Sequence, residues 1–260
     1  MTLLQFWGMP LAKVGNFCCN FGQFYFAKNI SELRTVCKQL KLGDLEKFAA
    51  QVTFENEIQY LTEVLKLALK NRQAQRVQRL IKQAKFPVVK TFDGYNFDPI
   101  TWPAGFSKEQ LLSLDFIKHK QNILCLGAVG TGKTYLATAL GVKACSLGKK
   151  VRFYRAIELA AELVEKHHSG SLNKILRHLK NFDLLILDEL GYIPFDRTSS
   201  QLLFNVISNS YQQQSVIITS NLEFGRWNEI FGDDRLTAAL IDRLVHRAYI
   251  FGFTGPSFRY

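Results

Sequence analysis

Short apolar runs alternate with amphipathic stretches over the second half of the 260-residue chain. Runs such as NILCLG (122–127) and DLLILD (183–188) are apolar along nearly their whole length, which is typical of parallel strands covered on both faces. Helical periodicity follows most of these runs, so the pattern predicts an α/β fold, a parallel sheet sandwiched by helices. The expected strands are 122–127, 151–154, 183–188, 215–220 and 249–253, and the expected helices are 133–147, 156–180, 199–213 and 236–246.

The first third of the chain shows only helical periodicity. A helix is expected after Ser31, and a longer helical run is expected from Thr53 to about Lys85, where Pro87 ends it. The stretch Phe92–Gly105 is interrupted by glycine and proline, which is typical of a connecting loop. The expected domains are an extension at 1–29, a small all-helical basic domain at 30–90, a linker at 91–105 and an α/β domain at 106–260.

Residues 1–29 contain no acidic residue and many aromatic ones, yet they lack the order of charge, apolar core and cleavage site that a secretory signal needs. We therefore expect a poorly ordered extension. No apolar run approaches the roughly 18 residues of a membrane helix, so no membrane association is expected. The five cysteines form no C-x-x-C pair, which disfavours a structural zinc site and favours a reducing, cytoplasmic compartment.

The charge of the chain indicates which class of partner it binds. The formal net charge is +11, and the segment Lys66–Lys90 holds eight basic residues and no acidic one. At helical spacing its arginines lie on a different face from its apolar residues, so the segment predicts contact with the phosphates of double-stranded DNA. A basic helix face that only meets water is the alternative. The expected DNA-binding residues are Arg72, Arg76, Arg79 and Lys82.

The sequence GAVGTGKT at 127–134 fits the phosphate-loop pattern G-x-x-x-x-G-K-[ST] and lies between an expected strand and an expected helix. Glycines let the backbone N–H groups of such a loop turn toward phosphate oxygens. Lys133 is expected to neutralise the terminal phosphates of ATP, and Thr134 to ligate Mg²⁺. The expected ATP-binding residues of the loop are Gly127, Ala128, Val129, Gly130, Thr131, Gly132, Lys133 and Thr134.

Two carboxylates follow the apolar run at 183–188. Asp188 is expected at the carboxyl edge of the sheet beside the phosphate loop, where it would hold the Mg²⁺ ion and the nucleotide. Glu189 is expected to orient and deprotonate an attacking water. Asn221, after the strand at 215–220, is expected to hold that water or to touch the γ-phosphate, although an asparagine that begins a turn is the simpler reading.

These motifs together resemble the IstB-like family. The resemblance covers about residues 31–260 and rests on the phosphate loop with, in the same order, LDELGYIPFD (187–196), VIITSN (216–221), WNEIFGDD (227–234), LIDRLVHR (240–247) and FTGPSFRY (253–260). Members of that family are AAA+ ATPases that help the transposase of a bacterial insertion sequence, and they are related to the DnaC-type helicase loaders.

The resemblance implies specific roles for residues of this chain. Gly127–Thr134 would be the Walker A loop, and Asp188 with Glu189 the Walker B pair. Asn221 would be the sensor-1 residue, Arg243 the arginine finger and Arg259 a sensor-2-like residue that touches the nucleotide. The family further implies an ATPase domain without a separate lid, ATP-dependent homo-oligomerisation on DNA, marking of target DNA for a cognate transposase, and release or remodelling on hydrolysis.

Two other functions remain open on the sequence. One is a replicative helicase loader on the same fold. The other is a DNA-binding accessory protein whose nucleotide is not hydrolysed, which the intact pair Asp188–Glu189 argues against.

Overall fold

The computed structural model describes residues 34–39, 41–43, 45–49 and 57–257. They form two compact units, which divide between Gln75 and Arg76, inside one long helix. The expected extension at 1–29 and Arg259 lie outside the described residues. The expected domain ranges stay predictions, although the division between the compact units falls before the expected linker at 91–105.

The first unit is helical in its described parts. It contains a helical segment at 34–39, α2 (Leu45–Ala49) and the first part of α3 (Glu57–Ala84). Cys37, Leu45 and Val64 are buried against one another, with Phe48, Tyr60 and Ala68 packed around them. Tyr60, Val64 and Ala68 recur at helical spacing, so one face of α3 packs on this small apolar core.

The second unit is built on a six-stranded sheet with the order β1-β6-β2-β5-β4-β3. The pairs β2–β6, β2–β5, β5–β4 and β4–β3 are parallel, and only the short β1 runs antiparallel, against β6. The parallel sheet that the sequence predicts is therefore confirmed. The strands are β1 (Ile100–Thr101), β2 (Asn122–Gly127), β3 (Val151–Arg155), β4 (Leu184–Leu190), β5 (Ser215–Ser220) and β6 (Ala248–Phe253).

Successive strand residues point to opposite faces, and both faces are buried. On β2 and β4, Ile123 and Ile186 belong to one apolar core, while Leu124 and Leu185 belong to the other. This explains why the strands read as continuous apolar runs. The first core includes residues of α6 and the end of α3, and the second includes residues of α7, α8, α9 and α11.

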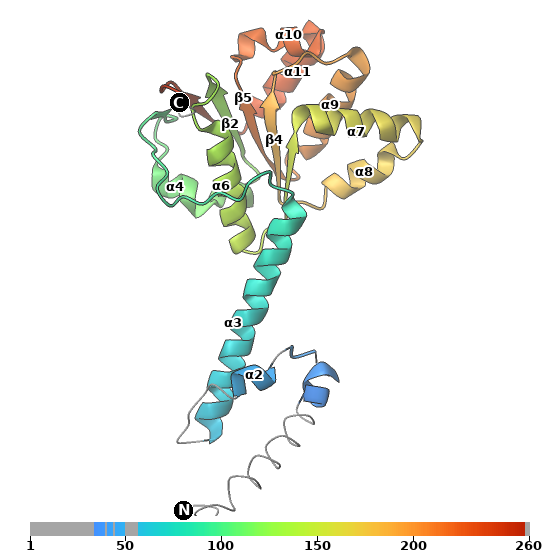
Figure 1. The fold of residues 1–260 in the computed structure, drawn as a ribbon. Coiled ribbons are helices and arrows are strands. Elements are labelled where there is room, and N and C mark those ends of the chain that lie inside the picture. The colour runs from blue at the N-terminus through green and yellow to red at the C-terminus, as the bar shows by residue number, and fades with distance from the viewer. Residues whose placement is uncertain (1–33, 40, 44, 50–56, 258–260) are drawn as a thin grey trace, which may run out of the picture. The chain divides into compact units, whose positions relative to one another are not determined.

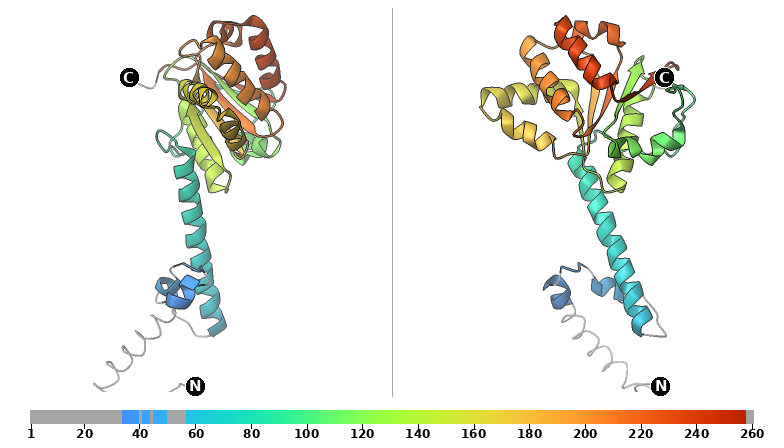
Figure 2. Two further views of the ribbon diagram at one scale, coloured as in Figure 1. Left: turned by 90° about the vertical axis from the view of Figure 1, so that its right-hand side faces the viewer. Right: turned by 180° about the vertical axis from the view of Figure 1, so that it is seen from behind.

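Figures 1 and 2 show helices on both sides of the sheet, with α6 on one side and α7 and α9 on the other. The helices of the second unit after α3 are α4 (Lys108–Ser113), α5 (Asp115–Lys118), α6 (Lys133–Ser146), α7 (Ala156–His168), α8 (Leu172–Leu179), α9 (Arg197–Ser210), the 3₁₀ turn η3 (Phe224–Arg226), α10 (Asn228–Phe231) and α11 (Asp234–Val245). None of the helices that the structure describes is long and apolar enough to cross a membrane.

Two expectations on secondary structure were wrong. The single helix expected at 156–180 is broken into α7 and α8, because Gly170 adopts a left-handed conformation with φ of +67°. The expected loop Phe92–Gly105 contains β1, whose two residues pair with Gly252 and Phe253. A strand of two residues is too short to give an alternating pattern.

Candidate functional site

The phosphate-loop sequence connects β2 directly to α6. A side chain at Gly127 would overlap the backbone of Phe253 in the neighbouring strand, and one at Gly130 would overlap Ser257. Both positions therefore need glycine. The N-cap of α6 is Gly132, with φ of +94° and no side chain to cap the helix. The first N–H groups of α6 are thus left for an anion, and the positive end of the helix dipole favours one.

The side chain of Lys133 lies inside this loop. It is buried, and its ammonium group donates hydrogen bonds to the carbonyl oxygens of Gly127 and Ala128, the first at 2.7 Å. Thr131 donates to Ala128 as well, at 2.8 Å, and holds the loop in its curled form. A buried ammonium group within a ring of backbone groups is suited to bind phosphate oxygens.

Asp188, near the end of β4, is 2% exposed. Its Oδ1 accepts a hydrogen bond from Thr134 at 2.9 Å and another from Thr219 at 2.6 Å. Burial raises the pKa of Asp188 above its usual value, and the two hydroxyl groups oppose that rise. The neighbouring oxygens of Thr134 and Asp188 are hard ligands of the kind that Mg²⁺ prefers, so this donor set fits the ion.

Glu189 follows at the next position but lies in a different environment. Its side chain is 42% exposed, and Oε2 lies 3.8 Å from Nε of Arg155, the last residue of β3. The backbone of Glu189 is left-handed, with φ of +58°. The Glu189 carboxylate is accessible to water, whereas Asp188 is enclosed, so the two neighbours are suited to different chemistry.

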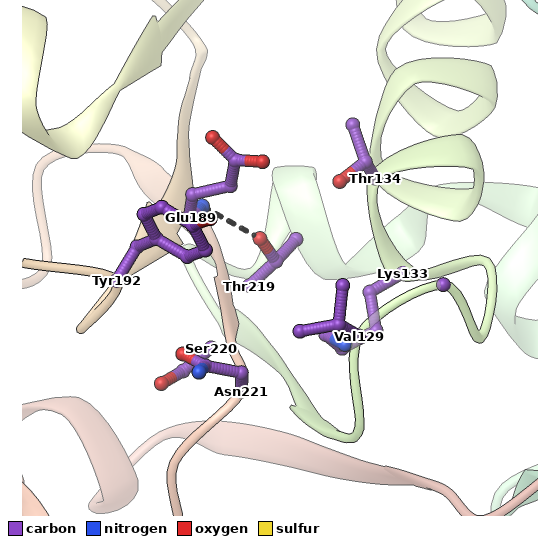
Figure 3. A pocket seen from close by; sticks show the side chains of 9 residues that line it. Val129, Lys133, Thr134, Glu189, Tyr192, Thr219, Ser220 and Asn221 are labelled. Carbon is purple, nitrogen blue, oxygen red and sulfur yellow. Dashed lines mark hydrogen bonds between the residues drawn. The ribbon is translucent and has the colours of Figure 1, made fainter. Parts of the chain in front are cut away.

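The phosphate loop and Glu189 line a common pocket of about 100 Å³. Figure 3 shows Thr134, Lys133 and Val129 on one side of it and Glu189, Tyr192, Thr219 and Asn221 on the other. Six sequence-predicted residues, from three separate segments, are therefore brought together: Val129, Gly130, Lys133, Thr134, Glu189 and Asn221. Their catalytic and binding roles stay predictions.

A second pocket of about 390 Å³ adjoins the same loop. It shares Gly130, Lys133 and Thr134 with the first pocket and is closed by the segment after α3. The ammonium group of Lys90 lies 5.2 Å from the ring centre of Tyr135, and Val88 lines the same space. This lining is more apolar than the carboxylate side, which suits the nucleoside part of a nucleotide.

Three residues near the carboxylates were missed in the sequence: Thr219, Arg155 and Tyr192. Arg155 lies beside Asp188 because β3 and β4 are neighbours in the sheet and these two residues are paired. The local sequence pattern does not specify the order of the strands in the sheet. The only signal for Arg155 was its position as a polar residue at the end of an expected strand. Thr219 carried a similar weak signal, two positions before Asn221.

The predicted arginine finger and the predicted DNA-binding residues lie elsewhere. Arg243 is exposed on α11, where its guanidinium group stacks over the ring of Phe204 at 5.2 Å, and it lines neither pocket. The predicted DNA-binding residues are exposed on α3 (Arg72, Arg76, Arg79 and Lys82). The guanidinium group of Arg76 lies close to Gly148, in the turn between α6 and β3.

Three solved structures have folds similar to that of this chain. The chain matches DnaI with a TM-score of 0.52 and 19% identity, over 70% of this chain and 93% of that one. It matches the DnaC helicase loader with a TM-score of 0.50 and 22% identity, over 63% and 96%. It also matches DnaA bound to AMPPCP and single-stranded DNA with a TM-score of 0.52 and 21% identity, over 65% and 51%. The chain therefore shares its fold with these three proteins.

Proteins found by sequence comparison are more similar to this chain in sequence than these solved structures are. An ATP-binding protein of insertion sequence IS5376 from Geobacillus stearothermophilus is 39% identical over 77% of this chain and 80% of its own length. The corresponding protein of IS21 from Pseudomonas aeruginosa is 36% identical over 88% of each chain. The sequence profile described as "IstB-like ATP binding protein" matches residues 35–260. The chain therefore belongs to the IstB-like family of ATP-binding proteins.

Proposed function

We propose that this chain is an Mg²⁺-dependent ATPase that assembles on double-stranded DNA and assists the transposase of an insertion sequence. One observation carries the ATPase part: the phosphate loop and Glu189 open on one pocket, and the hydrogen bond from Thr134 to the enclosed Asp188 joins the loop to the carboxylate pair. A site of this kind holds a phosphate chain at one side and a water-activating carboxylate at the other.

The nucleotide would bind across the loop. Lys133 would turn from the carbonyl groups of Gly127 and Ala128 toward the terminal phosphates, while the free N–H groups of α6 hold their oxygens. The base and ribose would occupy the larger pocket, between Val88 and Tyr135. This orientation directs the γ-phosphate toward Glu189 and Asn221.

When bound, Mg²⁺ supplies positive charge that stabilises the phosphate oxygens as charge develops on them. Thr134 and Asp188 would hold it through their oxygens. Glu189 would orient the attacking water and accept its proton, because its carboxylate is exposed in the pocket. Asn221 would contact the γ-phosphate from the side of the pocket that faces the phosphate loop. The closing of this pocket against bulk water would strengthen each of these contacts.

Arg243 would act on the nucleotide of a neighbouring subunit. Its guanidinium group lies on the surface of α11 over Phe204 and lines neither pocket of its own chain. An arginine at the surface can reach a neighbour's phosphates, and one such group can accelerate phosphoryl transfer by roughly 10³-fold or more. ATP hydrolysis would therefore require homo-oligomerisation.

The basic stripe on α3 would hold DNA through its phosphates. Three relatives that are 31–39% identical are named ATP-binding proteins of insertion sequences, which supports a role beside a transposase in the cytoplasm, where ATP and DNA are available. ATP binding would favour the assembly on DNA, and hydrolysis would release or remodel it. A helicase loader, or an accessory protein that never turns ATP over, would use the same fold differently.

The test is DNA retention by the hydrolysis-deficient variant Glu189→Gln with ATP, ADP or no nucleotide. Long-lived complexes with ATP alone, and preferential insertion into pre-bound DNA by a cognate transposase, would support the proposal. Equal retention in all three conditions would exclude ATP-dependent assembly. Stimulated loading of a replicative helicase, without an effect on the transposase, would identify the chain as a loader.

A further inference from the structure

The two strands that carry the site are out of register at the carboxylates. On β4 and β5, Leu187 is paired with Ile218, but the next pair is Leu190 with Ser220. Three steps along β4 therefore match two steps along β5, so Asp188 and Glu189 together face Thr219. This is a β-bulge, in which one strand carries an extra residue and its ladder of backbone hydrogen bonds is interrupted.

Glu189 is the strained residue of this bulge. Its φ of +58° is in the left-handed region, which favours glycine because a side chain there is unfavourable. A glutamate therefore stands where glycine would be more stable. Such strain persists only where surrounding contacts hold the residue in place.

The side chain of Thr219 supplies those contacts. The backbone N–H of Glu189 donates to Thr219 Oγ1 at 2.9 Å, a bond that Figure 3 shows as a dashed line. The same hydroxyl group donates its proton to Asp188 Oδ1 at 2.6 Å. Thr219 is 1% exposed, so water does not compete for either bond.

The two bonds depend on each other. A hydroxyl group has one proton and two lone pairs, so donation to Asp188 uses the only proton and leaves an acceptor for Glu189. Threonine is branched at Cβ, and its side chain is stiff in a strand, which fixes the direction of both bonds. One side chain thus sets the position of the Asp188 carboxylate relative to the backbone of Glu189.

We propose that Thr219 is the positioning residue of the carboxylate pair: it holds the bulge that directs Glu189 into the pocket while Asp188 stays enclosed. Thr219 acts through Asp188 and Glu189. The inference rests on the proposed function, since it assumes that Glu189 activates the water.

The experiment compares Thr219→Val, which keeps the shape and removes the hydroxyl group, with Thr219→Ser, which keeps the hydroxyl group. Ser215→Ala is the matched control, because Ser215 is a buried hydroxyl at the other end of β5 that donates to the Phe116 carbonyl at 3.1 Å. Each full-length variant is assayed on DNA for kcat and KM, and backbone amide exchange is measured without nucleotide.

We expect Thr219→Val to lower kcat by about tenfold or more, because a displacement of about 1 Å is enough to do so. KM for ATP should stay within about threefold, because binding of the ground state is untouched. The Glu189 amide should exchange at least about tenfold faster, as a lost protecting bond predicts. Thr219→Ser and Ser215→Ala should show neither effect.

A kcat like that of the wild type in Thr219→Val would overturn the assignment, and so would a failure of Thr219→Ser to restore it. Faster exchange throughout the domain, rather than at Glu189, would identify a merely structural role and also overturn it. If Thr219→Val does not fold, amide exchange in the wild type tests the assignment. Fast exchange of the Glu189 amide would exclude its hydrogen bond to Thr219. Wild-type turnover in Glu189→Gln would instead defeat the proposed function, whatever Thr219 does.

Discussion

The Thr134 hydroxyl, in the first turn of α6, donates a hydrogen bond to Asp188 Oδ1, near the end of β4, at 2.9 Å. The two residues are 54 positions apart in the sequence. Their contact exists because the carboxyl ends of parallel strands meet at one edge of a sheet, where the loop after β2 also begins. Two motifs that are separate in the sequence thereby become one site.

The ammonium group of Lys133 supplies the first test of that site. Replacing Lys133 with alanine should weaken ATP binding by about 10- to 100-fold, the loss expected for charge-assisted hydrogen bonds. Titration with a fluorescent ATP analogue measures this. Lys143→Ala removes the same charge from the last turn of α6 and serves as the control. Equal affinities of the two variants would exclude Lys133 from the phosphate site.

The buried carboxylate of Asp188 should lower the free energy of unfolding when no ligand is bound. At pH 7 and without nucleotide or Mg²⁺, Asp188→Asn should raise Tm by roughly 2–4 °C, as a gain of about 1 kcal/mol would in a chain of this size. The control is Glu189→Gln, whose side chain is 42% exposed and should leave Tm unchanged. Differential scanning calorimetry measures both, and a lower Tm in Asp188→Asn would contradict the account.

The sign of the pH dependence follows from the same burial. Because burial raises the pKa of Asp188, the folded protein holds this proton more tightly than the unfolded chain, whose value is near 3.9. The free energy of unfolding of the wild type therefore falls as the pH rises from that value through the folded-state pKa, and Asp188→Asn escapes the loss. The stability that Asp188→Asn gains over the wild type should therefore vanish in acid and be complete above the folded-state pKa of Asp188.

The sequence predicted the strands with accurate bounds because both faces of the sheet are buried. Buried strands must be apolar throughout, and the run 215–220 of the sequence is β5 residue for residue. The break between α7 and α8 was missed because Ser169, Gly170 and Ser171 are too short an interruption to stand out in a helical pattern.

The site was predictable where a motif fixes both residue type and spacing, as for Lys133 and Glu189. Thr219 and Arg155 were not predicted, because their contacts depend on strand order and on the bulge in β4. A bulge inserts one residue without changing the apolar pattern around it, so nothing in the sequence marks its position. Arg243 is a different case: its resemblance to an arginine finger rests on LIDRLVHR, and its exposure on α11 agrees with that expectation without testing it.

The basic face of α3 can be tested through the salt dependence of DNA binding. Replacing Arg72, Arg76 and Arg79 together by alanine should weaken binding equally to unrelated duplex sequences, because phosphates carry no sequence information. The slope of log K against log salt should fall by up to about 0.9 for each lost phosphate contact. Replacing Lys108, Lys118 and Lys120 removes the same net charge and is the control. An unchanged slope in the arginine variant would mean that the stripe meets water or protein.

Arg243 can be tested by mixing subunits. Arg243→Ala should bind ATP normally and hydrolyse it about 10³-fold more slowly, because a charge that stabilises the transition state is lost. Arg235→Ala, in the first turn of the same helix, should hydrolyse normally. Mixed with Glu189→Gln subunits, Arg243→Ala subunits should regain part of the activity, since some interfaces then pair an intact pocket with an intact arginine. Mixed assemblies that form without regaining activity would exclude action on a neighbour.

The most direct test of the central claim is the steady-state ATPase rate of wild type and Glu189→Gln on DNA, measured with ATP affinity in the same preparations. The account predicts DNA-stimulated turnover by the wild type, an ATP affinity in Glu189→Gln within about threefold of it, and a loss of kcat of about 10²- to 10⁴-fold, the range for a general base. Equal kcat in the two proteins, or a wild type that binds ATP on DNA without turning it over, would contradict it.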